Sequence, residues 1–122
     1  MTSSLLKKTI VAFVAIAVLA SGTAAFAQTF FSRSDRVLGF DTDVWRVWVP
    51  AGSSRIVVAA GSHTDIDLEV VDETTGRLLA VDNDGTSYCI GDIYMPYAGY
   101  IQIRIDNLGR FSNGYNVHVR SR

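Results

Sequence analysis

The sequence has very little cysteine and no surplus of charge of either sign. Cys89 is the single cysteine among 122 residues. It cannot form an internal disulfide or complete a zinc site of paired cysteines. The 11 lysines and arginines nearly balance the 12 aspartates and glutamates, which leaves a formal net charge of -1. A nucleic-acid-binding protein would carry a clear positive excess. Disulfide scaffolds, zinc ribbons and nucleic acid as a partner are therefore excluded.

The chain also lacks the signatures of common hydrolases. It contains no Gly-x-Ser-x-Gly elbow and no His-Glu-x-x-His helix. The two histidines, His63 and His118, are expected in a turn and on the outward side of the last strand, where both would be solvated. Cys89 beside Tyr88 is typical of a small buried hydrophobic residue. We therefore predict no catalytic residues and no enzymatic activity.

The first 27 residues have the three parts of an export signal. Lys7 and Lys8 precede an apolar run over residues 9–20, and Ala25-Phe26-Ala27 supplies the small-x-small site of signal peptidase. We predict cleavage before Gln28. A retained membrane anchor is the alternative, but polar residues interrupt the run well short of the roughly 20 apolar residues that a span requires. The expected location is the periplasm or the extracellular space, without a stable membrane anchor after cleavage.

Short segments of alternating polarity fill the rest of the chain. Ile101, Ile103 and Ile105 share one phase, and their polar neighbours share the other, as in a half-buried strand. Strands are expected at residues 44–49, 55–60, 65–71, 77–81, 90–95, 100–105 and 115–119. Turn signals separate them, such as Thr74-Thr75-Gly76 and Asn113-Gly114. No segment combines helix caps with a period of 3.6 residues.

This pattern predicts one all-β domain, an antiparallel β-sandwich of about seven to eight strands. Residues 28–37 show no alternation and are predicted to be an N-terminal arm, and residues 38–122 form the sandwich domain. A domain of this size buries one thin core. Because it has no disulfide, a bound metal could supply additional stability.

Four segments in the expected order resemble bacterial pre-peptidase C-terminal domains. They are Asp41 to Val47 with the turn Val49-Pro50-Ala51-Gly52, Asp65 to Val70, Ala98 to Ile105, and Tyr115 to Val119. The resemblance implies a jelly-roll-like sandwich that usually follows secreted proteases and other exported enzymes, and some relatives in collagenases bind collagen and calcium. Here Tyr100 stands one place early in its motif, and the domain directly follows the leader.

Pairs of aspartates are the candidate metal ligands. They are Asp41 with Asp43, Asp65 with Asp67, and Asp82 with Asp84. Calcium takes six to eight oxygen ligands, so carboxylates on neighbouring loops could hold it. The alternative is that these short side chains accept backbone N–H bonds and start turns, which needs no ion. An EF-hand is excluded, because aligning Gly85 with the loop glycine places Ala80 and Gly91 where acids belong.

Outward aromatic residues are the second candidate site. Trp48 and Tyr100 fall in the non-core phases of their strands, where exposed rings could stack on sugars or seat a polypeptide. Packing across the sheet, or cover by the predicted arm, is the alternative.

The expected function is a secreted or periplasmic, non-catalytic binding or accessory module. It would attach to an extracellular protein or glycan surface, or to a separately encoded exported enzyme such as a protease. A purely structural envelope protein is the alternative, and a small hydrolase is a third possibility that lacks a nucleophile and base.

Overall fold

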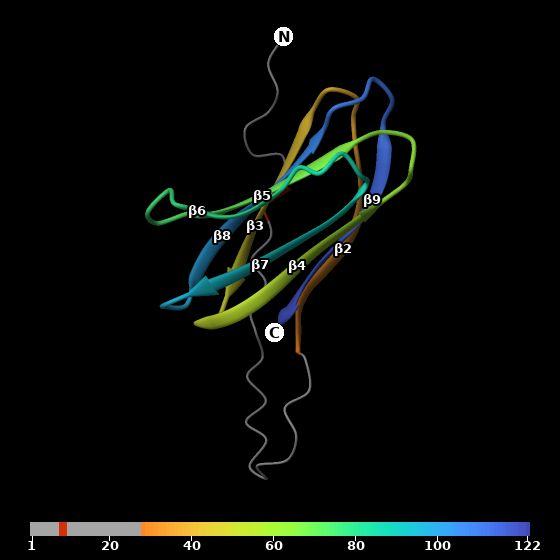
Figure 1. Ribbon diagram of the computed structural model, residues 1–122. Helices are drawn as coiled ribbons and strands as arrows, with labels where there is room; N and C mark the ends of the chain where they lie inside the picture. The colour runs from red at the N-terminus through yellow and green to blue at the C-terminus, as the bar shows by residue number, and fades with distance from the viewer. Residues whose placement is uncertain (1–7, 10–27) are drawn as a thin grey trace.

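The computed structural model describes residues 8–9 and 28–122 (Figure 1). Its strands are β1 (Lys8–Thr9), β2 (Thr29–Val37), β3 (Thr42–Val49), β4 (Gly52–Ala60), β5 (Ile66–Asp72), β6 (Leu78–Asp82), β7 (Tyr88–Met95), β8 (Gly99–Asn107) and β9 (Asn113–Ser121). The described part of the chain contains no helix that could span a membrane. The predicted export signal lies outside the described residues except for β1, so its cleavage stays a prediction.

Two antiparallel sheets face each other (Figure 1). One sheet has the order β3-β8-β5-β6, with the two-residue β1 running parallel to β3 at its edge. The other has the order β2-β9-β4-β7. Both sheets combine strands from the beginning and the end of the chain, as in a jelly roll. The predicted jelly-roll-like sandwich is confirmed, with four long strands in each sheet.

The core lies between the sheets and contains the inward residues that alternation identified, together with residues of β2, β4 and β7 whose facing the sequence did not assign. It is filled mainly by β-branched and other aliphatic side chains, which suit a pleated surface. Among the fully buried members are Val47, Val49, Ile56, Val58, Ile66, Leu68, Val70, Ile101, Ile103, Ile105, Val117 and Val119. The predicted strands are therefore present, and those whose alternation assigned a facing have that facing. Five of the seven are two to four residues longer than predicted, and β5 and β6 have the predicted length shifted by one residue.

Two local predictions are wrong. Residues 28–37 do not form a separate arm, because Thr29–Val37 is a strand paired with β9 at the edge of its sheet. Only Phe31 and Val37 are buried along it, while Arg33 and Asp35 take inward positions and remain exposed. The sequence of this strand therefore shows no alternation of apolar and polar residues. Charges at such positions protect an edge strand from pairing with another chain.

The predicted Asn113-Gly114 turn is instead the first part of β9. The Asn113 amide is buried, and it donates hydrogen bonds to the Gly61 carbonyl at 2.7 Å and to Thr64 Oγ1 at 3.0 Å. The Thr74-Thr75-Gly76 turn is confirmed: Gly76 has a φ of 74°, and its N–H bonds to the Asp72 carbonyl. Asn113 is therefore held in the strand by one backbone and one side-chain partner about fifty residues away in sequence.

A buried polar chain links the two sheets. Trp45 Nε1 donates to the Tyr115 hydroxyl at 2.8 Å, and that hydroxyl donates to Asp43 Oδ2 at 2.6 Å. All three side chains are buried. Burial raises the pKa of Tyr115 above its ordinary value, and the bond to the Asp43 carboxylate raises it further. Asp43 is thus held inside the sandwich by structural contacts.

Candidate functional site

Four connections gather at one end of the sandwich, at the upper right in Figure 1. They are the β2–β3 connection (38–41), the β4–β5 connection (61–65), the β6–β7 connection (83–87) and the β8–β9 connection (108–112). We call this group of residues the loop end. Loops held on a rigid sandwich are the usual position of binding residues, so the loop end is the first place to look for function.

Backbone hydrogen bonds join these connections to one another. The Phe40 N–H donates to the Gly109 carbonyl at 2.8 Å, and the Leu108 N–H donates to the Asp65 carbonyl at 3.0 Å. The Ile66 N–H donates to the Thr86 carbonyl at 3.2 Å. The first two bonds tie together connections that are distant in sequence, and the third joins the start of β5 to the β6–β7 connection. The loop end is therefore organised before any partner arrives, which reduces the entropy lost on binding.

Asn107 reinforces this arrangement. Its buried side chain donates to the Phe111 carbonyl at 2.8 Å and accepts the Gly109 N–H at 3.0 Å. Gly39 packs so closely that a Cβ added there would lie 2.1 Å from the Arg110 carbonyl oxygen. The β2–β3 and β8–β9 connections thus touch through their backbones and hold each other in one conformation.

Four large apolar side chains protrude from these two connections. Their exposed fractions are 58% for Leu38, 74% for Phe40, 49% for Leu108 and 60% for Phe111. We call this set the apolar tip. Phe40 also has a φ of 54°, in the left-handed region that bulky residues rarely adopt. Strain and exposure at the same residue are typical of functional sites.

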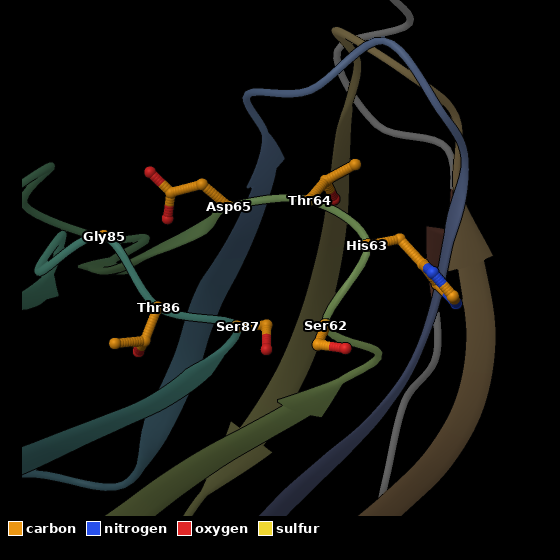
Figure 2. A pocket seen from close by; sticks show the side chains of 7 residues that line it. All are labelled: Ser62, His63, Thr64, Asp65, Gly85, Thr86 and Ser87. Atoms are coloured by element: carbon orange, nitrogen blue, oxygen red, sulfur yellow. The ribbon is translucent and has the colours of Figure 1, made fainter.

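A polar pocket of about 360 Å³ lies between the β4–β5 and β6–β7 connections of the loop end (Figure 2). Ser62, His63, Thr64, Asp65, Gly85, Thr86 and Ser87 line it. In Figure 2 Ser62 and Ser87 lie on facing connections, the Ser62 hydroxyl points away from Ser87, and the His63 ring points away from both. The Asp65 carboxylate lies on the opposite side of the pocket. The pocket can therefore donate and accept hydrogen bonds, but its serine, histidine and aspartate side chains do not converge as in a catalytic triad.

His118, predicted to be solvated, and Cys89, predicted to be a buried hydrophobic residue, have ordinary structural environments. His118 lies on the outward face of β9, with Nε2 3.5 Å from Thr29 Oγ1. The Cys89 thiol is buried and directed at the Ile66 carbonyl oxygen 3.1 Å away. Burial raises the pKa of this thiol to about 12, so it stays protonated and unreactive.

The six predicted metal ligands do not meet at one point. Among the described residues, no group of three histidine, cysteine or acidic side chains could hold a metal ion. Asp41 Oδ1 accepts the Thr42 N–H, Asp82 Oδ2 accepts the Ile90 N–H, and Asp84 Oδ1 accepts the Thr86 N–H. The residues as placed therefore do not fit calcium. Asp41 and Asp84 make the local backbone bonds expected of turn-forming aspartates, and Asp82 bonds across the β6–β7 connection.

Asp65 and Asp67 belong to a zone of negative charge on the β5 and β6 side. Burial raises the pKa of Asp67, and the nearby carboxylates of Asp65, Asp106, Asp82 and Asp84 raise it further. Repulsion within this zone weakens the folded state at neutral pH.

Trp48 and Tyr100, the predicted ligand surface, do lie together. Their ring centroids are 5.0 Å apart in an edge-to-face arrangement across β3 and β8. The Arg46 guanidinium lies over the Tyr100 ring at 3.5 Å and also bonds to Glu73 at 2.8 Å. Both rings are half-buried. Cross-strand packing, the alternative considered from the sequence, accounts for their main contacts, and ligand binding there stays a prediction.

Sequence reasoning missed the apolar tip. Leu38, Phe40, Leu108 and Phe111 lie outside every alternating segment, so no periodic pattern marked them. One signal was present: large apolar residues flank Gly39 and Gly109 in segments that should be polar turns. Unexpected apolar side chains in turns indicate an interaction surface.

Comparison with known proteins supports the fold. No family model and no curated protein matches the sequence. The chain is similar to the pre-peptidase C-terminal domain of a collagenase from Bacillus anthracis, with a TM-score of 0.61, 14% identity, and coverage of 73% of this chain and 87% of that one. The resemblance read from the sequence is thus confirmed at the level of the fold.

Two further solved structures span almost the whole chain. One is a periplasmic inhibitor of g-type lysozyme from Aeromonas hydrophila, with a TM-score of 0.57, 16% identity, and coverage of 95% of this chain and 96% of that one. The other is the corresponding inhibitor from Salmonella Typhimurium, with a TM-score of 0.54, 11% identity, and coverage of 94% and 98%. The fold is therefore one that solved exported binding proteins also use.

Proposed function

We propose that the protein is an exported, non-catalytic binding module that attaches to a folded partner protein through its loop end. The apolar tip is the observation that carries this proposal. Four large apolar side chains at the ends of strands cannot contribute to the core, and leaving them in water opposes solubility. Burial of one such side chain against a partner is worth about 1.5–3 kcal/mol.

The construction of the loop end favours a folded partner with a preformed surface. The apolar tip is exposed, and hydrogen bonds join the connections that carry it, so it is not suited to wrapping around an extended peptide. The polar pocket of the loop end supplies hydroxyls and a carboxylate at the rim. An apolar centre with a polar rim is the usual anatomy of a protein–protein interface. Phe40, the most exposed of the four, is the expected anchor.

An exported enzyme is the partner class that the proposal favours. The predicted leader directs the chain out of the cytoplasm. Solved proteins of the same fold include a collagenase domain and periplasmic inhibitors of g-type lysozyme, so a cell-wall hydrolase is the first probe to examine. A purely structural envelope protein would not need a strained, exposed phenylalanine.

The test uses a photo-crosslinking amino acid placed at Phe40 in the exported protein. The matched control is Leu78, which is 51% exposed but lies at the β5–β6 turn, on the opposite end of the sandwich. We expect the Phe40 position alone to capture one partner. With that partner purified, or with g-type lysozyme if it binds, Phe40→Ser should weaken binding at least about 30-fold, as for a hot-spot residue.

Leu78→Ser should leave the affinity unchanged. Equal capture from both positions, or equal affinities of the two variants, would contradict the proposed role of the loop end.

A further inference from the structure

The small net charge conceals a strong separation of charge between the two sheets. From residue 28 onward there are nine arginines and twelve acids. The strands β2, β9, β4 and β7, with the residue after β9, hold five of those arginines but only two acids, Asp35 and Asp92. The remaining ten acids lie on the other sheet or its connections. One side of the sandwich is therefore basic and the other acidic.

The outward surface of the basic sheet carries a like-charge pair at its centre. Arg55 on β4 and Arg120 on β9 occupy directly paired positions, so their side chains are neighbours on the same face. Asp92 lies on the other side of Arg55 and binds it at 2.7 Å and 3.0 Å. Arg122 also reaches Asp92, at 3.5 Å. One carboxylate thus faces three arginines, because Arg55, Arg122 and Arg120 all act on Asp92 and lower its pKa.

The like-charge pair is only partly compensated, because one carboxylate, Asp92, serves the arginines. Like charges in directly opposite positions destabilise a sheet, and local rules are broken mainly where function requires it. An anion bound between Arg55 and Arg120 would relieve the repulsion. Arg120 could donate two parallel hydrogen bonds to it, and Arg55, whose Nε and Nη2 bond to Asp92, could add its remaining N–H groups. The centre of this face therefore fits a carboxylate, sulfate or phosphate group.

Two exposed tyrosines lie on β7, the edge strand next to Arg55. Tyr88 and Tyr94 lie on the outward side of β7 and are 54% and 62% exposed, with Asp92 between them along the strand. Six residues of strand separate the two rings by about 20 Å. Aromatic rings with a hydroxyl at one end offer an apolar face and a polar edge, which suits packing against sugar rings. The separation matches an oligosaccharide rather than a single sugar.

We propose that the outward face of β2, β9, β4 and β7 binds a linear acidic polysaccharide. Its acidic groups would lie between Arg55 and Arg120, and its sugar rings would pack on Tyr88 and Tyr94. A protein partner is disfavoured here, because the core of a protein interface is depleted of charged residues, whereas this face has arginines on its two inner strands and its tyrosines on the edge strand β7. Together with the loop end, it would let the module hold a partner protein on an acidic glycan layer.

The test is a titration of the exported protein with hexagalacturonate and with a sulfated oligosaccharide of the same length. Cellohexaose, hexaglutamate, a short single-stranded DNA and phosphatidylglycerol vesicles are the comparators. At least one acidic oligosaccharide should bind, more weakly as salt rises, and cellohexaose should bind at least about tenfold more weakly, as expected without the charged hydrogen bonds. Hexaglutamate, DNA and vesicles should not bind as tightly as the acidic oligosaccharide.

The variants separate charge from stacking. Arg120→Gln should weaken binding about tenfold, and Tyr88→Ala and Tyr94→Ala about threefold or more each. Arg77→Gln, an exposed arginine on the β5–β6 turn, is the matched control and should change nothing. Thermal melts establish that each variant is folded. Binding of hexaglutamate, DNA or vesicles as tight as that of the oligosaccharide, tyrosine variants with wild-type affinity, or no binding of either acidic oligosaccharide would overturn the proposal.

Discussion

The Tyr115 hydroxyl is the most informative single group to remove from the fold. In Tyr115→Phe the ring that fills the core is kept, but Trp45 Nε1 loses an acceptor at 2.8 Å and Asp43 Oδ2 loses a donor at 2.6 Å. Each loss at a buried polar group is worth about 1–2 kcal/mol, so the free energy of unfolding should fall by about 2–4 kcal/mol. That is a large share of the few kcal/mol that hold a domain of this size.

Urea unfolding of the exported domain measures this change. We expect a lower urea midpoint. The slope of the unfolding free energy against urea concentration should be unchanged, because the same surface is exposed on unfolding. The melting temperature should fall by about 10 °C or more. Tyr94→Phe is the matched control, since its hydroxyl lies on a side chain that is 62% exposed. If Tyr115→Phe stays within about 0.5 kcal/mol of the wild type, like an ordinary surface change, the buried chain does not stabilise the fold.

The same residue gives the wild type a signature at high pH. Tyrosine in the unfolded chain loses its proton near pH 10, while burial raises the pKa of Tyr115 in the folded protein. Above about pH 10 the unfolded state therefore binds fewer protons than the native state, and stability falls as pH rises. Tyr115→Phe lacks this contribution, so its stability should fall less steeply over that range. Parallel curves for the two proteins would argue against a buried Tyr115.

Four other predictions test the remaining parts of the structure. Ile103→Asp places a charge in the fully buried centre of β8 and should abolish stable folding, so a near-native melting curve would contradict the inward facing. Gly39→Ala should loosen the loop end and lower stability by about 1–3 kcal/mol, because its Cβ meets the Arg110 carbonyl; an unchanged melt would show that the connections do not touch. Melting curves in chelator, in magnesium and in millimolar calcium should coincide, because the described aspartates as placed form no metal site. A melting temperature that rises in calcium alone would show that calcium binds. The intact mass of the exported protein should begin at Gln28, and a full-length membrane-bound product would refute cleavage.

Alternation predicted most of the fold because a half-buried strand imposes a period of two. Ile101, Ile103 and Ile105 illustrate this, since each is fully buried and its neighbours are not. The rule failed for β2, because an edge strand needs few inward apolar residues and places charges where a central strand could not. It also failed at Asn113, whose role depends on Gly61 and Thr64 on a distant connection.

The candidate sites were less accessible to sequence reasoning. The apolar tip exists because the β2–β3 and β8–β9 connections, about seventy residues apart, meet in space. The basic face exists because pairing brings Arg55 beside Arg120, whereas the net charge of -1 averages both sides of the sandwich. Asp43 could be recognised as acidic but not as buried, because its partner Tyr115 is 72 residues away. Chain topology, rather than local pattern, creates these features.

The central claim is that the loop end is the protein-binding surface, and amide hydrogen exchange tests it most directly. Exchange is measured for the protein alone and for the protein saturated with the partner captured at Phe40. We predict slower exchange at residues 38–41 and 108–112, with no change in the β5–β6 turn at residues 73–77. Protection confined to that turn or to other surfaces, with the loop end exchanging as in the free protein, would contradict the claim.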